Sequence, residues 1–264
     1  MNINGKVILI VGASTGMGRI VALKAAALGA KLAITARSED KLEKLKEEIF
    51  SIGAECLSIA SDALDEMASG QLVEKVVAHF SSIDLVLLNV GGAPAIDMRV
   101  MSASDVKYYM RSNYDVTVNY LFPVLAQMKI QKSGCVVHTN SLAGFLGLPM
   151  QGPYSAAKGA TRLLMDTCRI EFSEYGITFL NVYPGFIATA RTQGDGMKAP
   201  FEISEEKGAD HILYAIEKDK SNYLFPFVMR WAIRLARVLP QRFLNTVLKR
   251  GMTILSDDSD SKTI

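Results

Sequence analysis

The feature that most constrains the fold is an alternation of short apolar runs with longer segments of helical periodicity. The first run, Lys6–Val11, ends at a glycine, and comparable runs follow at 31–36, 56–60, 84–89, 134–139 and 178–183. Strands buried on both faces read as continuous apolar runs, and strands that alternate with helices are typical of βαβ units. With an edge strand at 223–227, the sequence predicts a doubly wound (Rossmann) α/β fold, a parallel sheet of about seven strands with helices on both faces.

Length and composition fit one such domain. The chain has 264 residues, of which 49% are hydrophobic, and this is enough for a sizeable core. Cys56, Cys135 and Cys168 have no metal-ligand spacing and cannot all pair, which favours a reducing, cytoplasmic compartment and no metal. The first apolar run is too short to span a bilayer and lacks a basic leader, so we expect no signal peptide. Residues 1–220 have no excess of Lys and Arg that would indicate binding of nucleic acid.

A glycine-rich turn joins the first apolar run to the first helical segment. Its residues are Gly12, Ala13, Ser14, Thr15, Gly16, Met17 and Gly18. A turn of this kind lets backbone N–H groups approach a phosphate at the positive end of the following helix. The spacing is G-x-x-x-G-x-G, not the commoner G-x-G-x-x-G. We interpret it as a dinucleotide-binding turn, and a tight turn with glycines for packing is the alternative.

The end of the second predicted strand bears on which dinucleotide is bound. An acid there hydrogen-bonds the ribose 2′-hydroxyl of NAD, whereas an arginine accommodates the 2′-phosphate of NADP. Here Arg37 follows the run 31–36, and the first acid is Glu39. The sequence therefore favours NADP(H) over NAD(H), with an ordinary solvated arginine as the alternative.

Residues suited to a binding site follow the other predicted strands as well. The markers at the six strand ends are Gly12, Arg37, Asp62, Asn89, Ser141 and Pro184. Because the carboxyl ends of parallel strands meet at one edge of a sheet, we expect these markers to line a single site.

Tyr154 and Lys158 are spaced i, i+4 at the start of a helix predicted over 154–175. On a helix the two side chains share one face. Taken alone, the spacing also fits an exposed helix face. An ammonium favours a neighbouring phenolate, so we expect Lys158 to lower the pKa of Tyr154 toward neutrality. Such a tyrosine can exchange a proton at working pH, while Ser141 holds a substrate oxygen beside it.

Two further segments bear on the site. We predict one long helix over Ser104–Lys129, with Ser104 as N-cap, Asn113 in its interior and a bend at Pro123. Asn113 is then either exposed or bonded to a backbone carbonyl or a water. Residues 186–203 lack a clear period, and we interpret them as a loop over the site.

As a set, these motifs resemble the short-chain dehydrogenase/reductase family over roughly residues 5–227. The resemblance rests on Gly12-x-x-x-Gly16-x-Gly18, Asp62, Asn89-Val90-Gly91, Asn113, Ser141, Tyr154-x-x-x-Lys158, and Pro184-Gly185 with Thr189. The sequence departs from the family pattern at Val11, where threonine is common, and at Leu88, where asparagine is common. The resemblance implies a nucleotide-binding and catalytic domain over 1–226 that moves hydride between NAD(P)(H) and an alcohol or carbonyl compound.

The resemblance also implies roles for individual residues. Tyr154 is the acid/base, Lys158 lowers its pKa and holds the nicotinamide ribose, and Ser141 orients the substrate oxygen. Asn113 holds a water in a proton relay, and Asp62 meets the adenine. The cofactor-binding set is Gly12, Ser14, Thr15, Gly16, Met17, Gly18, Arg37, Asp62, Ala63, Asn89, Gly91, Tyr154, Lys158, Pro184, Gly185, Ile187 and Thr189. The family is often dimeric or tetrameric through the helices predicted at 104–129 and 154–175.

The C-terminal segment differs in charge from the rest of the chain. Residues 221–264 carry seven Lys/Arg against three Asp/Glu, and no acid lies between Asp219 and Asp257. Two basic amphipathic helices are predicted over 227–239 and 241–250, within a C-terminal extension of the domain at 227–256, and 257–264 are expected to be disordered. The extension either packs on its own domain or a neighbouring subunit, lies on an anionic membrane surface, or binds a protein partner.

The substrate class is only weakly indicated. Apolar residues in the loop and the extension, Phe186, Ile187, Phe201, Ile203 and Trp231, favour a hydrophobic alcohol or ketone. Two alternatives stay open: a regulatory or scaffold protein that binds NADP(H) without turnover, and a peripheral membrane reductase that acts on a lipid.

Overall fold

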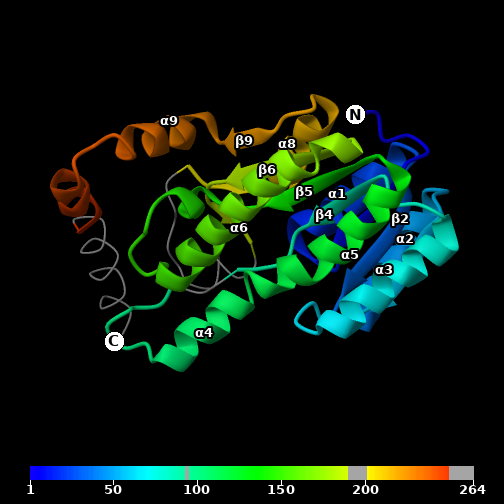
Figure 1. Cartoon of the computed structure of the whole chain (residues 1–264), viewed down its shortest axis with the longest axis horizontal. Helices are drawn as coiled ribbons and strands as arrows, with labels where there is room; N and C mark the ends of the chain where they lie inside the picture. Colours follow the sequence, from blue (N-terminus) through cyan, green and yellow to red (C-terminus); the bar gives the residue numbers. More distant parts are fainter. Residues whose placement is uncertain (93–94, 190–200, 250–264) are drawn as a thin grey trace.

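The computed structural model describes residues 1–92, 95–189 and 201–249. Its centre is a seven-stranded sheet in the order β3-β2-β1-β4-β5-β6-β9, in which every pairing is parallel (Figure 1). The strands are β1 (Val7–Val11), β2 (Lys31–Ala36), β3 (Cys56–Ala60), β4 (Leu85–Leu88), β5 (Gly134–Thr139), β6 (Ile177–Pro184) and β9 (Asn222–Phe225). The order reverses direction between β1 and β4, the kind of switch point beyond which doubly wound sheets bind ligands. The predicted doubly wound α/β class is confirmed.

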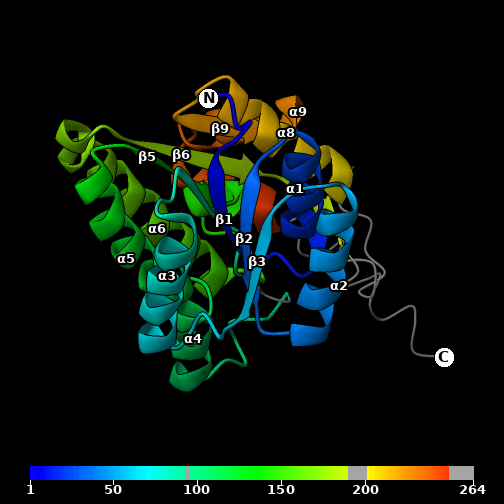
Figure 2. The ribbon, with the colours of Figure 1, turned by 90° about the vertical axis from the view of Figure 1, so that its right-hand side faces the viewer.

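Helices cover both faces of this sheet (Figure 2). One face carries α1 (Gly16–Ala27), α2 (Glu39–Ser51) and α8 (Glu205–Glu217), and the other carries α3 (Glu66–Phe80), α5 (Asp115–Gln131) and α6 (Gly152–Glu171). Side chains of a strand point alternately to opposite faces, so Ile8 and Ile10 join the first core while Leu9 and Val11 join the second. All of β1 is therefore buried, which explains its unbroken apolar run.

The helix predicted over 104–129 is in fact two helices, so this prediction is wrong. α4 (Ala103–Arg111) ends before Asn113, and α5 begins at Asp115, while Pro123 stays inside α5. The N-cap of α4 is Ser102, not Ser104, and its hydroxyl accepts from the Asp105 N–H in a capping box. The chain breaks at Asn113 because its side chain bonds backbone groups outside the helix.

Short elements frame the end of β6. Ile187–Ala188 (β7) pairs in parallel with Ile203–Ser204 (β8), so both ends of the predicted loop 186–203 are ordered, and 190–200 lie outside the described residues. A 3-10 turn, η1 (Leu142–Phe145), follows β5, and a second, η2 (Ser173–Tyr175), follows α6.

The C-terminal extension is helical where it is described. α9 (Phe227–Ala236) follows β9, and residues 241–249 form a further helix. The segment predicted to be disordered, 257–264, lies outside the described residues. Among the helices of the described residues, none has the length and apolar character needed to cross a membrane.

Candidate active site

The glycine turn between β1 and α1 is packed against the end of β4. A Cβ on Gly12, which has a φ of +86°, would lie 2.8 Å from the Asn89 carbonyl oxygen. A Cβ on Gly18 would overlap the Gly12 carbonyl oxygen. The Gly12 and Ala13 N–H groups donate to the Thr35 carbonyl at 2.9 and 3.1 Å, which ties the turn to β2. Glycine is therefore required at both ends of the turn.

The start of α1 fits an anionic ligand. Thr15 at the N-cap makes no side-chain capping bond, and the first turn holds no acid. Uncapped N–H groups and the helix dipole together favour a phosphate at this end. Glu205 approaches from the start of α8, with its Oε1 3.1 Å from where a Cβ on Gly16 would lie. Burial, together with the charge of Glu206, raises the pKa of Glu205.

Arg37 and Asp62 stand at the same edge of the sheet, after β2 and β3. Arg37 is exposed, and its guanidinium has no hydrogen-bond or ion-pair partner among residues 1–92, 95–189 and 201–249. Asp62 is exposed and accepts from the Leu64 N–H at 3.0 Å, and Asn119 of α5 donates to the Ala63 carbonyl at 2.9 Å. At this edge, the exposed carboxylate of Asp62 therefore follows β3, and the Arg37 guanidinium, which has no partner among the described residues, follows β2.

Asn113 fastens the loop after β4 to the break between α4 and α5. It is fully buried, and its Oδ1 accepts from the Gly92 N–H at 2.6 Å. Its Nδ2 donates to the carbonyls of Gly92 and Tyr109, at 3.2 and 2.9 Å. A Cβ on Gly91 would lie 2.8 Å from this Oδ1 and 3.5 Å from Lys158 Nζ. Asn113, from the break between α4 and α5, and Lys158, from α6, therefore both approach Gly91 on the side where a Cβ would project.

Tyr154, Lys158 and Ser141 converge at the end of β5. Lys158 is 3% exposed; its Nζ donates to the Thr139 carbonyl at 2.8 Å and lies 5.8 Å from the centroid of the Tyr154 ring. Ser141 caps η1, with its Oγ accepting from the Ala143 N–H at 3.2 Å, and its side chain is hydrogen-bonded to Tyr154. The structure thus brings together three groups that are 13 and 17 residues apart in the sequence.

The pKa values differ from the sequence-based expectation. Burial raises the pKa of the Tyr154 phenol, and the hydrogen bond from Ser141 opposes that rise. Burial also lowers the pKa of Lys158, to about 8. The prediction that Lys158 brings the pKa of Tyr154 below its usual value is wrong for this arrangement, because desolvation disfavours the phenolate and Nζ is turned to the Thr139 carbonyl.

The sequence reasoning missed Asn140, which joins the two halves of this cluster. Asn140 is 2% exposed, its Oδ1 accepts from the Ser141 N–H at 2.8 Å, and its Nδ2 donates to the Lys158 carbonyl at 3.1 Å. One amide therefore sets the position of Ser141 relative to the turn of α6 that carries Lys158. The available signal was an asparagine directly between a buried strand and the serine at its end.

The remaining predicted residues follow β6. Pro184 is its last residue, and the Gly185 N–H donates to the Phe225 carbonyl at 2.8 Å. Ile187 is buried in β7, and Thr189 follows that strand. A Cβ on Gly185 would overlap the Met229 sulfur of α9, so the extension packs directly on this end of the site. The six strand-end markers thus all stand at carboxyl ends of the parallel sheet.

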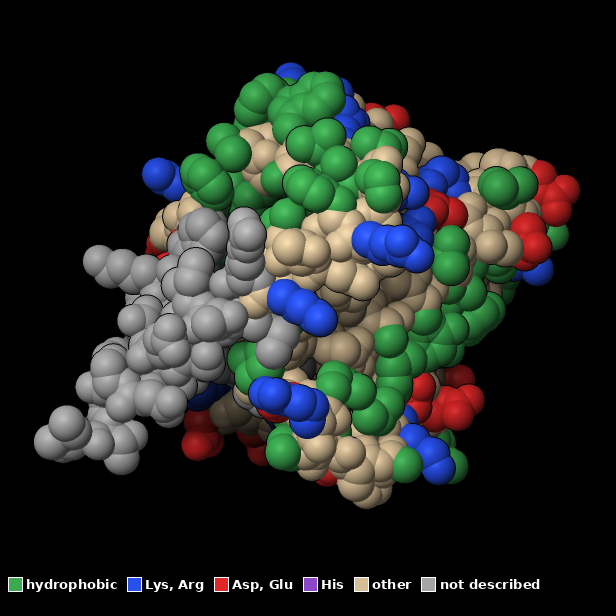
Figure 3. Space-filling view, turned by 90° about the vertical axis from the view of Figure 1, so that its left-hand side faces the viewer, with side chains coloured by type: hydrophobic (Ala, Val, Ile, Leu, Met, Phe, Trp, Pro, Cys, Tyr) green, Lys and Arg blue, Asp and Glu red, His purple; other side chains and the backbone are tan. Residues whose placement is uncertain are grey.

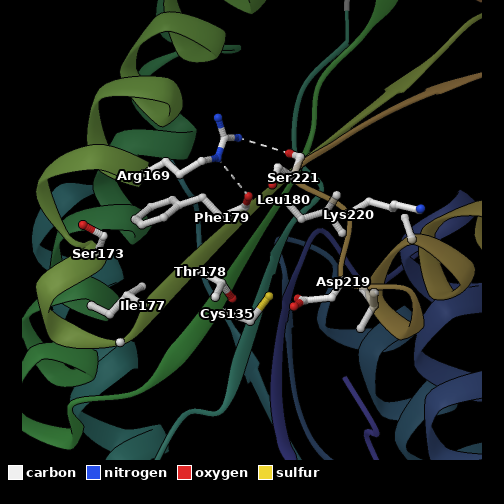
Figure 4. Close-up of a pocket in the computed structure, with 13 residues that line it drawn as sticks. Cys135, Arg169, Ser173, Ile177, Thr178, Phe179, Leu180, Asp219, Lys220 and Ser221 are labelled. Carbon is white, nitrogen blue, oxygen red and sulfur yellow. Dashed lines mark hydrogen bonds between the residues drawn. The ribbon is translucent and has the colours of Figure 1, made fainter.

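A separate pocket of about 310 Å³ lies at the opposite edge of the sheet, where β5 and β6 begin. Arg169 reaches across it to donate to the carbonyls of Phe179 and Ser221, with Cys135 and Asp219 facing it (Figure 4). Its guanidinium is also bonded to Asp166 at 2.7 Å. The pocket contains none of the predicted site residues, and its arginine serves to hold strands and helix together.

The fold, together with the glycine turn and the polar residues at the carboxyl ends of the strands, defines a dinucleotide-binding protein of the Rossmann type. The family described as short chain dehydrogenase matches residues 6–198. An oxidoreductase of Listeria monocytogenes that has no assigned substrate is 30% identical over 230 residues, which are 83% of this chain and 93% of that protein. This chain therefore belongs to the short-chain dehydrogenase family.

Two relatives with named activities agree with this assignment. The 3-oxoacyl-[acyl-carrier-protein] reductase of Staphylococcus epidermidis is 32% identical over 185 residues, covering 70% of this chain and 76% of that enzyme. An alcohol dehydrogenase of the archaeon Thermococcus sibiricus, solved with 5-hydroxy-NADP, superposes with a TM-score of 0.76 at 25% identity, covering 83% and 95% of the two chains. The protein is a hydride-transferring oxidoreductase that uses a nicotinamide dinucleotide and acts on a small-molecule alcohol or carbonyl compound.

Proposed function

We propose that this oxidoreductase interconverts a hydrophobic alcohol and its ketone with NADP(H), and that Tyr154 is its general acid/base. The observation that carries the proposal is the convergence of Tyr154, Lys158 and Ser141 at the same sheet edge as the glycine turn. Three groups suited to proton transfer are thereby held beside a site suited to a dinucleotide.

The dinucleotide, when bound, supplies or accepts the hydride at its nicotinamide. The chain's own residues orient the substrate and transfer the proton. Ser141 Oγ orients the substrate oxygen, and the Tyr154 hydroxyl gives that oxygen a proton in reduction or takes one in oxidation. Lys158 Nζ, held by the Thr139 carbonyl, places a positive charge near the developing phenolate. Asn113, which approaches Gly91 on the same side as Lys158, fits a relay that returns the proton toward solvent.

The cofactor contacts are proposed residue by residue. The turn from Gly12 through Ser14, Thr15, Gly16 and Met17 to Gly18 takes the pyrophosphate, Asp62 and Ala63 take the adenine, and Asn89 and Gly91 line the middle. Pro184, Gly185, Ile187 and Thr189 take the nicotinamide end. The uncommitted guanidinium of Arg37 after β2 supports a 2′-phosphate, and hence NADP(H) over NAD(H).

A hydrophobic substrate is supported by the residues after Ser141. Leu142 and Ala143 are buried, and Phe145 and Leu146 are partly buried in a cluster with Tyr183. This apolar cluster begins directly after the residue proposed to orient the substrate oxygen, which favours an apolar group on the rest of the substrate.

We also propose that copies of this chain associate through the exposed faces of α5 and α6. Both helices expose large apolar side chains, with Phe122 48%, Ile130 78%, Leu163 58% and Ile170 76% exposed. Exposed apolar side chains on adjacent helices favour a subunit contact, consistent with a homodimer or homotetramer. Sedimentation of the purified protein tests it.

The proposal is tested by Tyr154→Phe, with Tyr108→Phe on the exposed surface of α4 as the matched control. The first variant is expected to lose at least about 100-fold in kcat for a panel of ketones, because the proton donor is gone. Its dissociation constant for NADPH should stay within about threefold, since the ring remains. Full turnover of Tyr154→Phe would refute the mechanism, and tight NADPH binding by the unaltered protein with no turnover across the panel would favour a non-catalytic regulator.

A further inference from the structure

Helix α9 has two apolar faces, and residues 1–92, 95–189 and 201–249 cover only the inner one. Toward the domain, Ile233 is 8% exposed and packs with Leu142 and Tyr183, and Met229 joins the same cluster. On the outer side, a stripe of large apolar side chains faces solvent. This outer stripe consists of Phe227 (65% exposed), Val228 (49%), Trp231 (51%) and Leu235 (60%) of α9, with Val238 (78%) in the turn just beyond it. Of the alternatives left open for this extension, packing on its own domain therefore holds for the inner face of α9 and does not account for the outer stripe.

Arginines flank the aromatic rings of the outer stripe. The Arg230 guanidinium lies 4.8 Å from the centroid of the Phe227 ring, and that of Arg234 lies 5.0 Å from the Trp231 ring. The helix over 241–249 continues the pattern, with Phe243 57% exposed beside an exposed Arg242. The sequence has no acid from 220 to 256 that would neutralise this surface. Viewed from the end of the molecule where α9 lies, hydrophobic side chains gather over its upper part with basic side chains beside and below them (Figure 3).

The combination of exposed apolar side chains with arginines favours an anionic membrane surface over a second copy of the chain as the partner of the outer stripe. A second copy docking through the same stripe would bring Arg230 and Arg234 against their own counterparts with no acid between them, and like charges oppose such a contact. An anionic bilayer offers acyl chains to the apolar stripe and phosphates to the arginines at the same time. Tryptophan, apolar with one polar N–H, suits the boundary between those two layers.

We propose that α9 docks this protein on an anionic lipid surface, with the outer stripe in the acyl boundary and the flanking arginines at the phosphate level. The inner face of α9 then lies between the bilayer and the candidate site, because Met229 contacts Gly185 and Ile233 packs on Leu142, the residue after Ser141. Entry of a hydrophobic substrate from the bilayer rests on the proposed function, whereas docking itself does not.

The chain offers its own reporter for this docking. Trp231 is the single tryptophan of the sequence, and it lies in the outer stripe. We therefore expect its emission to shift to the blue when the full-length protein meets vesicles of phosphatidylcholine with about 30% phosphatidylserine. Brominated acyl chains should quench the emission, and raising the salt should weaken the binding, because screening reduces the attraction of arginines to phosphates. Vesicles of phosphatidylcholine alone should give at least a tenfold weaker partition coefficient.

Paired variants separate the two contributions. Arg230→Gln with Arg234→Gln should lower the partition coefficient into anionic vesicles at least tenfold, whereas Lys41→Gln with Lys44→Gln, an equal loss of exposed charge on α2, should leave it unchanged. Leu235→Ser should lower it on both vesicle types, whereas Met67→Ser, at a 73% exposed position of α3, should not.

Several results would overturn the proposal. Equal partition into both vesicle types would show that the arginines of α9 do not bind anionic lipid. Equal losses of partition coefficient in the double variants of α9 and α2 would show the same. A blue shift that appears without vesicles as protein concentration rises, together with a dimer in sedimentation that Leu235→Ser abolishes, would assign the stripe to a second copy. None of these readouts uses turnover, so failure of docking and failure of the proposed chemistry are distinguishable.

Discussion

Asn140 provides the sharpest test of how the site is held together. Replacing it with alanine removes the acceptor of the Ser141 N–H at 2.8 Å and a donor to the Lys158 carbonyl at 3.1 Å. Each hydrogen bond contributes about 0.5–1.5 kcal/mol, and the partly buried Ser141 N–H loses its acceptor, so the free energy of unfolding should fall by about 2–3 kcal/mol. Ser141 and the Lys158 turn of α6 would also lose their common anchor, and kcat/KM should fall about 10–100-fold.

Gln131 is the matched control for Asn140. It is half-buried at the end of α5, and its side chain accepts from the Ile83 N–H and donates to the Ile83 carbonyl, each at 3.0 Å. It also donates to the Ser133 carbonyl at 3.4 Å and accepts from Gln127 at 2.9 Å. Those bonds lie where β4 begins, away from the candidate site. Urea unfolding should show similar losses for Asn140→Ala and Gln131→Ala, whereas NADPH-coupled turnover should fall only in the first. If both variants keep full kcat/KM, the anchoring role of Asn140 is refuted; Asn140→Asp, which keeps the acceptor alone, serves if the alanine variant does not fold.

Two further predictions concern the cofactor and the buried amine. Arg37→Ala should weaken NADPH binding at least about tenfold and NADH binding by less than about twofold, measured by fluorescence titration, and equal losses would contradict a 2′-phosphate contact. Burial lowers the pKa of Lys158 from 10.5 to about 8 in the folded protein, so between those values the unfolded chain binds more protons and stability rises with pH. The free energy of unfolding of the unaltered protein minus that of Lys158→Met should therefore rise by up to about 3 kcal/mol from pH 7 to pH 10.5, measured by urea titration. A difference that does not change with pH would contradict the lowered pKa.

The strands were predictable because their signal is local. Lys31–Ala36 and Gly134–Thr139 were predicted with the bounds that the structure has, since each is a short, mainly apolar run between segments of different character. The order of the strands also places the predicted markers at one edge, as expected for a parallel sheet. The identity of these central strands therefore followed from the pattern of apolar residues alone.

The misses share a different cause, which is contact between distant segments. The break at Asn113 depends on its bonds to Gly92, 21 residues earlier, and helical periodicity does not contain that information. Burial raises the pKa of Tyr154, and Lys158 Nζ, whose position beside the phenol the sequence suggested, donates instead to a carbonyl 19 residues away. Likewise, the periodicity of α9 predicted apolar and basic stripes but not which of them the domain covers.

The contact of α9 with η1 has a consequence for local unfolding. Two guanidinium groups lie near the Phe145 ring, that of Arg162 of α6 at 5.1 Å and that of Arg237, just beyond α9, at 5.4 Å from its centroid. Segments packed on one another in this way open together in native-state hydrogen exchange. The amides of residues 142–146 should therefore exchange at a rate set by the detachment of α9, and any ligand that holds α9 in place would also slow opening of the turn that follows Ser141.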